Sequence, residues 1–135
     1  MNAKCLSVDT PTVLVVEDED AIQTLIEEAL AEAGFHPAIS PSGEEAVTLL
    51  KGHKDKYQAL VTDINLRSRM DGWEVARYAR EIHPEFPVVY ISGAGREDWP
   101  SKGVPNSIML AKPFAPAQLV TAVSQLLNDA SRGGT

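Results

Sequence analysis

The sequence predicts an α/β fold: a doubly wound, five-stranded parallel sheet with helices on both of its faces. Five short apolar runs, rich in valine, isoleucine and leucine, alternate with segments whose apolar residues recur at helical spacing. No linker, repeat or low-complexity block interrupts this alternation, and 135 residues suffice for one domain with a buried core. Strands that alternate with helices form parallel sheets covered on both faces, and right-handed crossovers then favour the doubly wound sandwich.

The first half of the chain contains three predicted strands and two predicted helices. The strands are TVLVVE at 12–17, FHPAIS at 35–40 and YQALVTD at 57–63. The first helix ends at Gly34, and its apolar face consists of Ile22, Leu25, Ile26, Ala29, Leu30 and Ala33. The second helix begins near Ser42, which has capping-box spacing to Glu45. Its apolar residues are Ala46, Val47, Leu49 and Leu50.

The second half contains a third helix, two further strands and a last helix. The strands are PVVYIS at 87–92 and SIMLA at 107–111. Pro84 closes the third helix, whose apolar face is Val75, Ala76, Ala79 and Ile82. The last helix begins at Pro116 and buries Leu119, Val120, Val123, Leu126 and Leu127. Residues 93–106 carry two prolines and three glycines, so we expect the fourth helix, between the last two strands, to be short or absent.

The composition is that of an ordinary globular protein and disfavours several classes of function. The net charge of −7, from 12 basic and 19 acidic residues, argues against nonspecific binding to nucleic acid or to anionic membranes. No apolar run approaches the roughly 20 residues of a membrane span, and the N-terminus lacks the apolar segment of a secretory signal. Cys5 is the only cysteine, which excludes an internal disulfide and predicts a cytoplasmic protein.

Polar side chains follow the strands at the edge where such folds bind ligands, beyond the carboxyl ends. Glu17 and Asp18 follow the first strand, Asp63 and Ser92 end the third and fourth, and the fifth leads to Lys112. Carboxylates gathered at one edge repel one another unless a cation lies between them. Oxygen ligands without histidine or cysteine favour Mg2+. The sequence therefore predicts a magnesium site here.

The same group of residues is suited to phosphoryl chemistry. An aspartate beside Mg2+ and a lysine can attack a phosphoryl group and hold it as an acyl phosphate. The metal and Lys112 would offset the charge on the transferring oxygens, and Ser92 offers a hydrogen-bond donor to them. A local charge change of about −1 is then available for a movable neighbour to sense.

Four stretches, VLVVEDE, LVTDINL with MDGWE, VVYISGAG and LAKPF, have the order and spacing of one known family. Together they resemble the receiver domain of two-component response regulators, over residues 12–127. The resemblance implies a flavodoxin-like fold with strand order 2-1-3-4-5 and a cis Lys112–Pro113 peptide bond. It also implies a domain at 12–128 between a flexible N-terminus at 1–11 and a flexible tail at 129–135.

The resemblance also implies a role for each residue of the site. Asp63 is the expected phosphoacceptor, Ser92 the switch hydroxyl and Lys112 the cation that binds the phosphate. The expected Mg2+ ligands are Glu17, Asp18, Asp63 and the main-chain carbonyl of Asn65. The acidic residues after Asp18 fit the ordinary preference of helix N-termini for carboxylates, so Glu19 and Asp20 are interpreted in that way.

The implied function is signalling by a protein that turns over no separate substrate. A histidine kinase or histidine phosphotransfer protein would donate the phosphoryl group, and an unidentified downstream protein would bind the altered surface. The domain would catalyse only its own phosphorylation and dephosphorylation. Eight residues follow Leu127, from which we expect a free-standing regulator. The kinase, the target and the pathway are not predicted.

Three departures from the family pattern keep alternatives open. Glu17 stands where aspartate is more usual, so it would bind the metal directly or through water. The stretch 63–72 is one residue longer than is common and has no proline after Leu66. Met109 replaces the usual switch aromatic, which leaves a phosphorylation-independent adaptor as the second hypothesis. A third hypothesis, a small Mg2+-dependent phosphohydrolase, is disfavoured because residue 65 is asparagine and not a second carboxylate.

Overall fold

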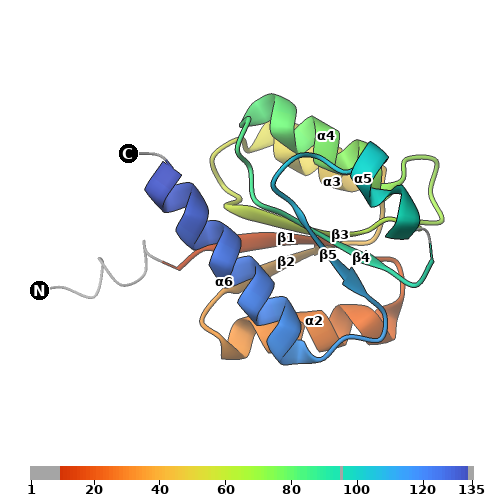
Figure 1. The fold of residues 1–135 in the computed structure, drawn as a ribbon, viewed down its shortest axis with the longest axis horizontal. Helices are drawn as coiled ribbons and strands as arrows, with labels where there is room; N and C mark the ends of the chain where they lie inside the picture. The colour runs from red at the N-terminus through yellow and green to blue at the C-terminus, as the bar shows by residue number, and fades with distance from the viewer. Residues whose placement is uncertain (1–9, 95, 134–135) are drawn as a thin grey trace, which may run out of the picture.

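The computed structural model describes residues 10–94 and 96–133 and confirms the predicted order of elements (Figure 1). The strands are β1 Thr12–Val16, β2 His36–Ser40, β3 Ala59–Asp63, β4 Val88–Ser92 and β5 Ile108–Ala111. The helices are α2 Asp20–Glu32, α3 Gly43–Gly52, α4 Gly72–Ile82, α5 Trp99–Lys102 and α6 Pro116–Gly133, with a 3-10 turn η1 at Arg96–Asp98. The predictions for 1–9, Cys5 among them, lie outside the described residues.

All five strands are parallel, in the order β2-β1-β3-β4-β5 that the resemblance implied. Helices α3 and α4 cover one face of the sheet, and α2 and α6 cover the other (Figure 1). Because the strands are parallel, their carboxyl ends meet at a single edge. The Lys112–Pro113 bond beyond β5 is cis, as expected.

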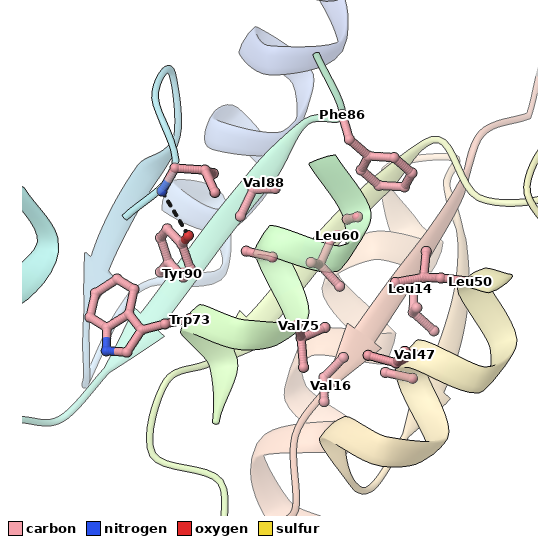
Figure 2. Close-up of a cluster of buried hydrophobic side chains, with 14 of the residues drawn as sticks. Leu14, Val16, Val47, Leu50, Leu60, Trp73, Val75, Phe86, Val88 and Tyr90 are labelled. Carbon is pink, nitrogen blue, oxygen red and sulfur yellow. Dashed lines mark hydrogen bonds between the residues drawn. The ribbon is translucent and has the colours of Figure 1, made fainter. Parts of the chain in front are cut away.

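The alternation of side chains along the strands divides the core into two clusters. Leu14, Leu60 and Tyr90 point toward α3 and α4 (Figure 2), whereas Val13, Val61 and Ile91 point toward α2 and α6. Nearly every residue of β1, β3 and β4 is buried, since helices cover both faces of a parallel sheet. The apolar runs in the sequence are therefore continuous and not alternating.

Helix α4 starts immediately beside the end of β3. Asp71 caps it by accepting from the Glu74 N–H at 3.0 Å, while Glu74 accepts from the Asp71 N–H at 3.2 Å. This capping box was readable in the sequence, at the same spacing as Ser42 and Glu45, but the prediction did not use it. A Cβ on Gly72 would lie 2.2 Å from the Asp63 carbonyl oxygen, so only glycine allows this close approach.

The fourth predicted helix is short, as expected, with α5 forming a single turn of four residues. The segment from Trp99 to Ser107, called the α5 segment below, is held by side-chain contacts. The Val104 N–H donates to the Tyr90 hydroxyl at 3.0 Å, dashed in Figure 2. The Trp99 indole donates to Ser107 Oγ at 2.9 Å, and Gly103 leaves room for the indole ring.

Helix α6 runs through Gly133, past Asn128 where the domain was expected to end. The residues after Asn128 include no proline to stop the helix, so the backbone of 129–133 is helical where a flexible tail was expected. Within the described part of the chain, none of the helices combines the length and apolar character needed to cross a membrane.

Candidate functional site

Three carboxylates meet at the carboxyl edge of the sheet. Glu17 and Asp18 follow β1, and Asp63 is the last residue of β3. One oxygen from each lies within 4.8 Å of the others. The two strands are hydrogen-bonded neighbours, so the register of the sheet alone places their ends side by side. The predicted gathering of these acidic residues is thus present in the structure.

Lys112 reaches this group from the end of β5. Its Nζ donates to Asp63 Oδ2 at 2.8 Å and lies 3.4 Å from Glu17 Oε1 and 3.3 Å from Glu19 Oε1. Partial burial lowers the pKa of Lys112, but the hydrogen bond and charge of Asp63, together with Glu17 and Glu19, raise it overall. The lysine therefore remains charged, and its ammonium partly compensates the carboxylates.

Glu17 is the most buried carboxylate of the site, with no exposed surface. Its Oε2 accepts from the Glu19 N–H at 3.0 Å, but its Oε1 has no hydrogen-bond partner among the described residues. Burial raises the pKa of Glu17 from 4.5 to about 7; the Glu19 N–H opposes this rise, and the charge of Asp63 adds to it. A buried carboxylate oxygen without a hydrogen bond is costly, and the Lys112 ammonium 3.4 Å away offsets only part of that cost.

Asp63 is 3 % exposed and has both oxygens engaged. Oδ1 accepts from the Asn65 N–H at 2.9 Å, and Oδ2 accepts from Lys112. The Asn65 side chain donates to the Ala94 carbonyl at 2.9 Å, which ties the β3–α4 loop to the end of β4. The role of the Asn65 main-chain carbonyl as a metal ligand stays a prediction.

Ser92 lies at the same edge, but its hydroxyl does not bond to Asp63. It is buried and donates to the Ala94 main-chain carbonyl. Met109 packs against the core cluster beneath α4, and the aromatic pair in that cluster is Trp73 and Tyr90, with ring centroids 4.7 Å apart. The aromatic ring of this part of the core is therefore that of Tyr90 on β4, two residues before Ser92, and the corresponding side chain of β5 is Met109.

Two residues of the site escaped the sequence analysis. Glu19 was read as an ordinary helix start, yet it has no side-chain capping bond and its carboxylate contacts Lys112. Arg67 was not singled out. Its main-chain N–H donates to Asp18 Oδ2 at 2.8 Å, and its Nε lies 3.5 Å from the same oxygen. The acidic run itself pointed to Glu19, whereas no local pattern pointed to Arg67.

These residues surround an open pocket of about 390 Å³, called the carboxylate pocket below. Its lining consists of Asp18, Glu19, Asp63, Asn65, Arg67, Gly93, Ala94 and Lys112. Backbone of the β4–η1 loop forms one wall, and the β3–α4 loop forms another. The pocket combines a carboxylate that can act as a nucleophile, clustered acidic oxygens that can bind a cation, and two cationic side chains. Phosphoryl transfer requires groups of these kinds.

The donor set fits a hard divalent cation. Three carboxylates in one cluster repel one another, and the unbonded Glu17 Oε1 leaves buried charge that Lys112 only partly offsets. A cation bound among these oxygens relieves both costs. Oxygen ligands without nitrogen or sulfur favour Mg2+ over softer metals.

Comparison with known proteins agrees with this geometry. Residues 13–124 match the family model of the response regulator receiver domain. The response regulator receiver protein CpdR of Brucella abortus is 32% identical over 117 residues, which cover 85% of this chain and 95% of CpdR. The sensor kinase CckA of the same organism is 33% identical over 119 residues, 86% of this chain but 12% of CckA.

Solved structures show the same relationship. The crystal structure of a response regulator receiver protein from Sinorhizobium medicae WSM419 superimposes with a TM-score of 0.87 at 47% identity, covering 90% of this chain and 97% of that one. The family match spans most of the chain, and the Sinorhizobium protein shares its architecture. The chain therefore belongs to the receiver domain family of two-component response regulators.

Proposed function

We propose that this receiver domain accepts a phosphoryl group on Asp63, from a histidine kinase or histidine phosphotransfer protein, in a Mg2+-dependent reaction. One observation carries the proposal. The Asp63 carboxylate is nearly buried, lies 2.8 Å from the Lys112 ammonium and forms one cluster with Glu17 and Asp18. An ordinary surface aspartate would have neither the neighbouring ammonium nor the neighbouring pair of carboxylates.

The transfer step is balanced by groups at the site. One oxygen of Asp63 attacks the phosphorus of phosphohistidine, an O–P bond forms, and the P–N bond breaks. Its electron pair stays on the imidazole nitrogen, which then takes a proton from water. The Asn65 N–H orients the Asp63 carboxylate, and the Lys112 ammonium stabilises negative charge on the transferring oxygens.

Glu17, Asp18 and Asp63 would hold Mg2+ in this site, with the Asn65 carbonyl as the further ligand that the family resemblance implies. When bound, the ion supplies positive charge that offsets the phosphoryl oxygens. The chain's own residues keep the surroundings partly dry, since Glu17 and Asp63 are buried. Glu17 would hold the ion directly or through a water molecule.

The proposed partners follow from family membership and from two relatives. CckA is a sensor kinase and CpdR a receiver protein, which supports phosphoryl donation by a kinase and signalling through protein binding. CpdR is matched over 95% of its length, whereas the match covers 12% of CckA. Within this proposal the domain is cytoplasmic and turns over no substrate other than its own aspartyl phosphate.

Incubation with radiolabelled acetyl phosphate and Mg2+ tests the proposal. The wild-type protein should take up an acid-stable, base-labile label, as acyl phosphates do, and Asp63→Asn should take up none. Asp71→Asn is the matched control, because asparagine also caps α4 and the label should persist. Label on the Asp63→Asn protein would show that the acceptor is another residue.

A phosphorylation-independent adaptor is the second candidate, because the Ser92 hydroxyl is already bonded to Ala94 and Met109 is not aromatic. Beryllofluoride with Mg2+ separates the two functions. A receiver that switches should show amide shift changes at Ser92, Ala94 and Lys112 in the NMR spectrum. A spectrum unchanged at these residues favours the adaptor.

A further inference from the structure

Arg67 lies in the β3–α4 loop and is anchored through its backbone. Its N–H donates to Asp18 Oδ2 at 2.8 Å, which ties this loop to the end of β1. The position of Arg67 over the carboxylate pocket therefore does not depend on its side chain. Substitution of the side chain should leave the loop in place.

The guanidinium itself is held only weakly. Its Nε lies 3.5 Å from Asp18 Oδ2, and the side chain is 76% exposed, whereas that of Asp18 is 15% exposed. A single, long and solvated contact contributes little to stability. The guanidinium nonetheless carries a permanent charge and five N–H donors, and Arg67 lines the same pocket as Asp63 and Lys112. It is thus a cation free to change partners within the pocket.

The two cations of the pocket divide the carboxylates between them. Lys112 contacts Asp63, Glu17 and Glu19, and Arg67 contacts Asp18. Asp18 would be a ligand of a divalent cation held at the acidic cluster, and the charge of that cation would repel the guanidinium. A phosphoryl group on Asp63 then brings the only new negative charge into the pocket, and guanidinium groups bind phosphoryl oxygens well.

We propose that Arg67 is a second cation of the phosphorylation site that exchanges partners. It pairs with Asp18 in the metal-free protein and with the phosphoryl oxygens on Asp63 when Mg2+ occupies the acidic cluster. The inference rests on the proposed function and adds to it a residue outside the family motifs. It makes the guanidinium a competitor of the metal and a helper of phosphoryl transfer.

The exchange predicts two effects of opposite sign in Arg67→Ala. Removal of the competing charge should tighten Mg2+ binding by roughly three- to tenfold, as expected for charges a few ångströms apart near a protein surface. Loss of a donor to the transferring oxygens should slow phosphorylation by acetyl phosphate at saturating Mg2+ by roughly five- to tenfold. A residue that merely shapes the loop would weaken both properties together.

The Mg2+ affinity is measured by calorimetry and by tryptophan fluorescence, since buried Trp73 adjoins Gly72, which packs on Asp63. Arg69→Ala is the control, an exposed arginine of the same loop outside the pocket, and should match the wild type in both assays. Arg67→Lys keeps the charge but not the planar fork of donors. Its Mg2+ affinity should therefore return to the wild-type value, while the rate recovers only in part.

The results distinguish a failure of the Arg67 exchange from a failure of phosphorylation on Asp63. An Arg67→Ala protein that matches the Arg69→Ala protein in both assays overturns the exchange, and so does one in which affinity and rate fall together. Wild-type protein that takes no label on Asp63 overturns the proposed function itself. In that case the Mg2+ titration still tests whether Arg67 competes with the metal.

Discussion

The carboxylate pocket and the α5 segment both adjoin β4 and β5, but different interactions hold them. Charged side chains form the pocket, whereas hydrogen-bonded aromatic side chains hold the α5 segment. At the pocket, Asp63 and the neighbouring Glu17 are both nearly buried beside the Lys112 ammonium, and Glu17 Oε1 has no hydrogen bond among the described residues. The α5 segment has little regular structure, yet the buried Tyr90 hydroxyl and the Trp99 indole each have a hydrogen-bond partner. The named polar groups of the irregular α5 segment and its anchor therefore all have hydrogen-bond partners, whereas one buried oxygen at the carboxylate pocket has none in the described part of the chain.

This difference indicates that the carboxylate pocket is the less stable of the two regions. Buried carboxylates that repel one another destabilise the folded state until a cation binds between them. Paired hydrogen bonds and aromatic packing stabilise it in every state. Changes in the pocket should therefore depend on pH and metal, whereas changes in the α5 segment should not.

The largest effect should come from Gly72→Ala, which packs on the backbone of Asp63 beside the carboxylate pocket. The new methyl group would meet the Asp63 carbonyl at 2.2 Å, and backbone atoms cannot rotate away as a side chain can. We expect the free energy of unfolding in urea to fall by at least about 3 kcal/mol. Gly52→Ala is the control, because its Cβ would meet nothing within 4 Å and alanine is the better helix former; a similar loss there would contradict the steric argument.

The next effect is a pH dependence caused by Glu17. Its pKa is raised from 4.5 to about 7 in the folded protein, so the folded state holds this proton more tightly than the unfolded one. Its contribution is fully present below pH 4.5 and is lost as the pH rises through about 7. Without Mg2+, this group should lower the unfolding free energy by about 3 kcal/mol between the two ends of that range.

Glu17→Gln should remove most of that pH dependence, because glutamine does not titrate. Glu27→Gln, the same change on the exposed face of α2, should leave it intact. Millimolar Mg2+ should raise the melting temperature of the wild type more at pH 8 than at pH 5, since protons then compete less with the metal. If the unfolding free energy of the Glu17→Gln protein depended on pH as that of the wild type does, Glu17 would not be the titrating group.

A smaller effect is expected for Tyr90→Phe, on the strand β4 that anchors the α5 segment. The substitution leaves the Val104 N–H without its acceptor in a buried position, which should cost about 1.5 kcal/mol of unfolding free energy at any pH. Tyr78→Phe, the same change at a half-buried tyrosine of α4, should cost less than about 0.5 kcal/mol. A Tyr90→Phe cost that varied with Mg2+ would instead link this segment to the carboxylate pocket.

The smallest effect should be that of Trp99→Phe. The change removes the indole hydrogen bond to Ser107, but Trp99 is 36% exposed, so water can replace the lost partner. A decrease of about 0.5 kcal/mol is expected from urea denaturation followed by circular dichroism. A larger loss than that of Tyr90→Phe would show that the indole, and not the buried hydroxyl, holds the α5 segment.

The architecture and the location of the site could both be predicted from the sequence. Apolar periodicity and capping residues set the order of strands and helices, and the parallel arrangement sends every strand end to one edge. Glu17, Asp18, Asp63 and Lys112 could therefore be placed together before their contacts were known. Pro100, Gly103 and Pro105 likewise sufficed to predict a short α5.

The partners that these groups take depend on how the whole chain packs. The contacts of Glu19 with Lys112 and of Arg67 with Asp18 depend on loop paths that no local periodicity encodes. The Ser92 hydroxyl bonds to Ala94, and Tyr90 bonds to Val104, fourteen positions away. Side-chain rotamers and long-range contacts follow from the packing of the whole chain, whereas the strand and helix pattern follows from neighbours in sequence.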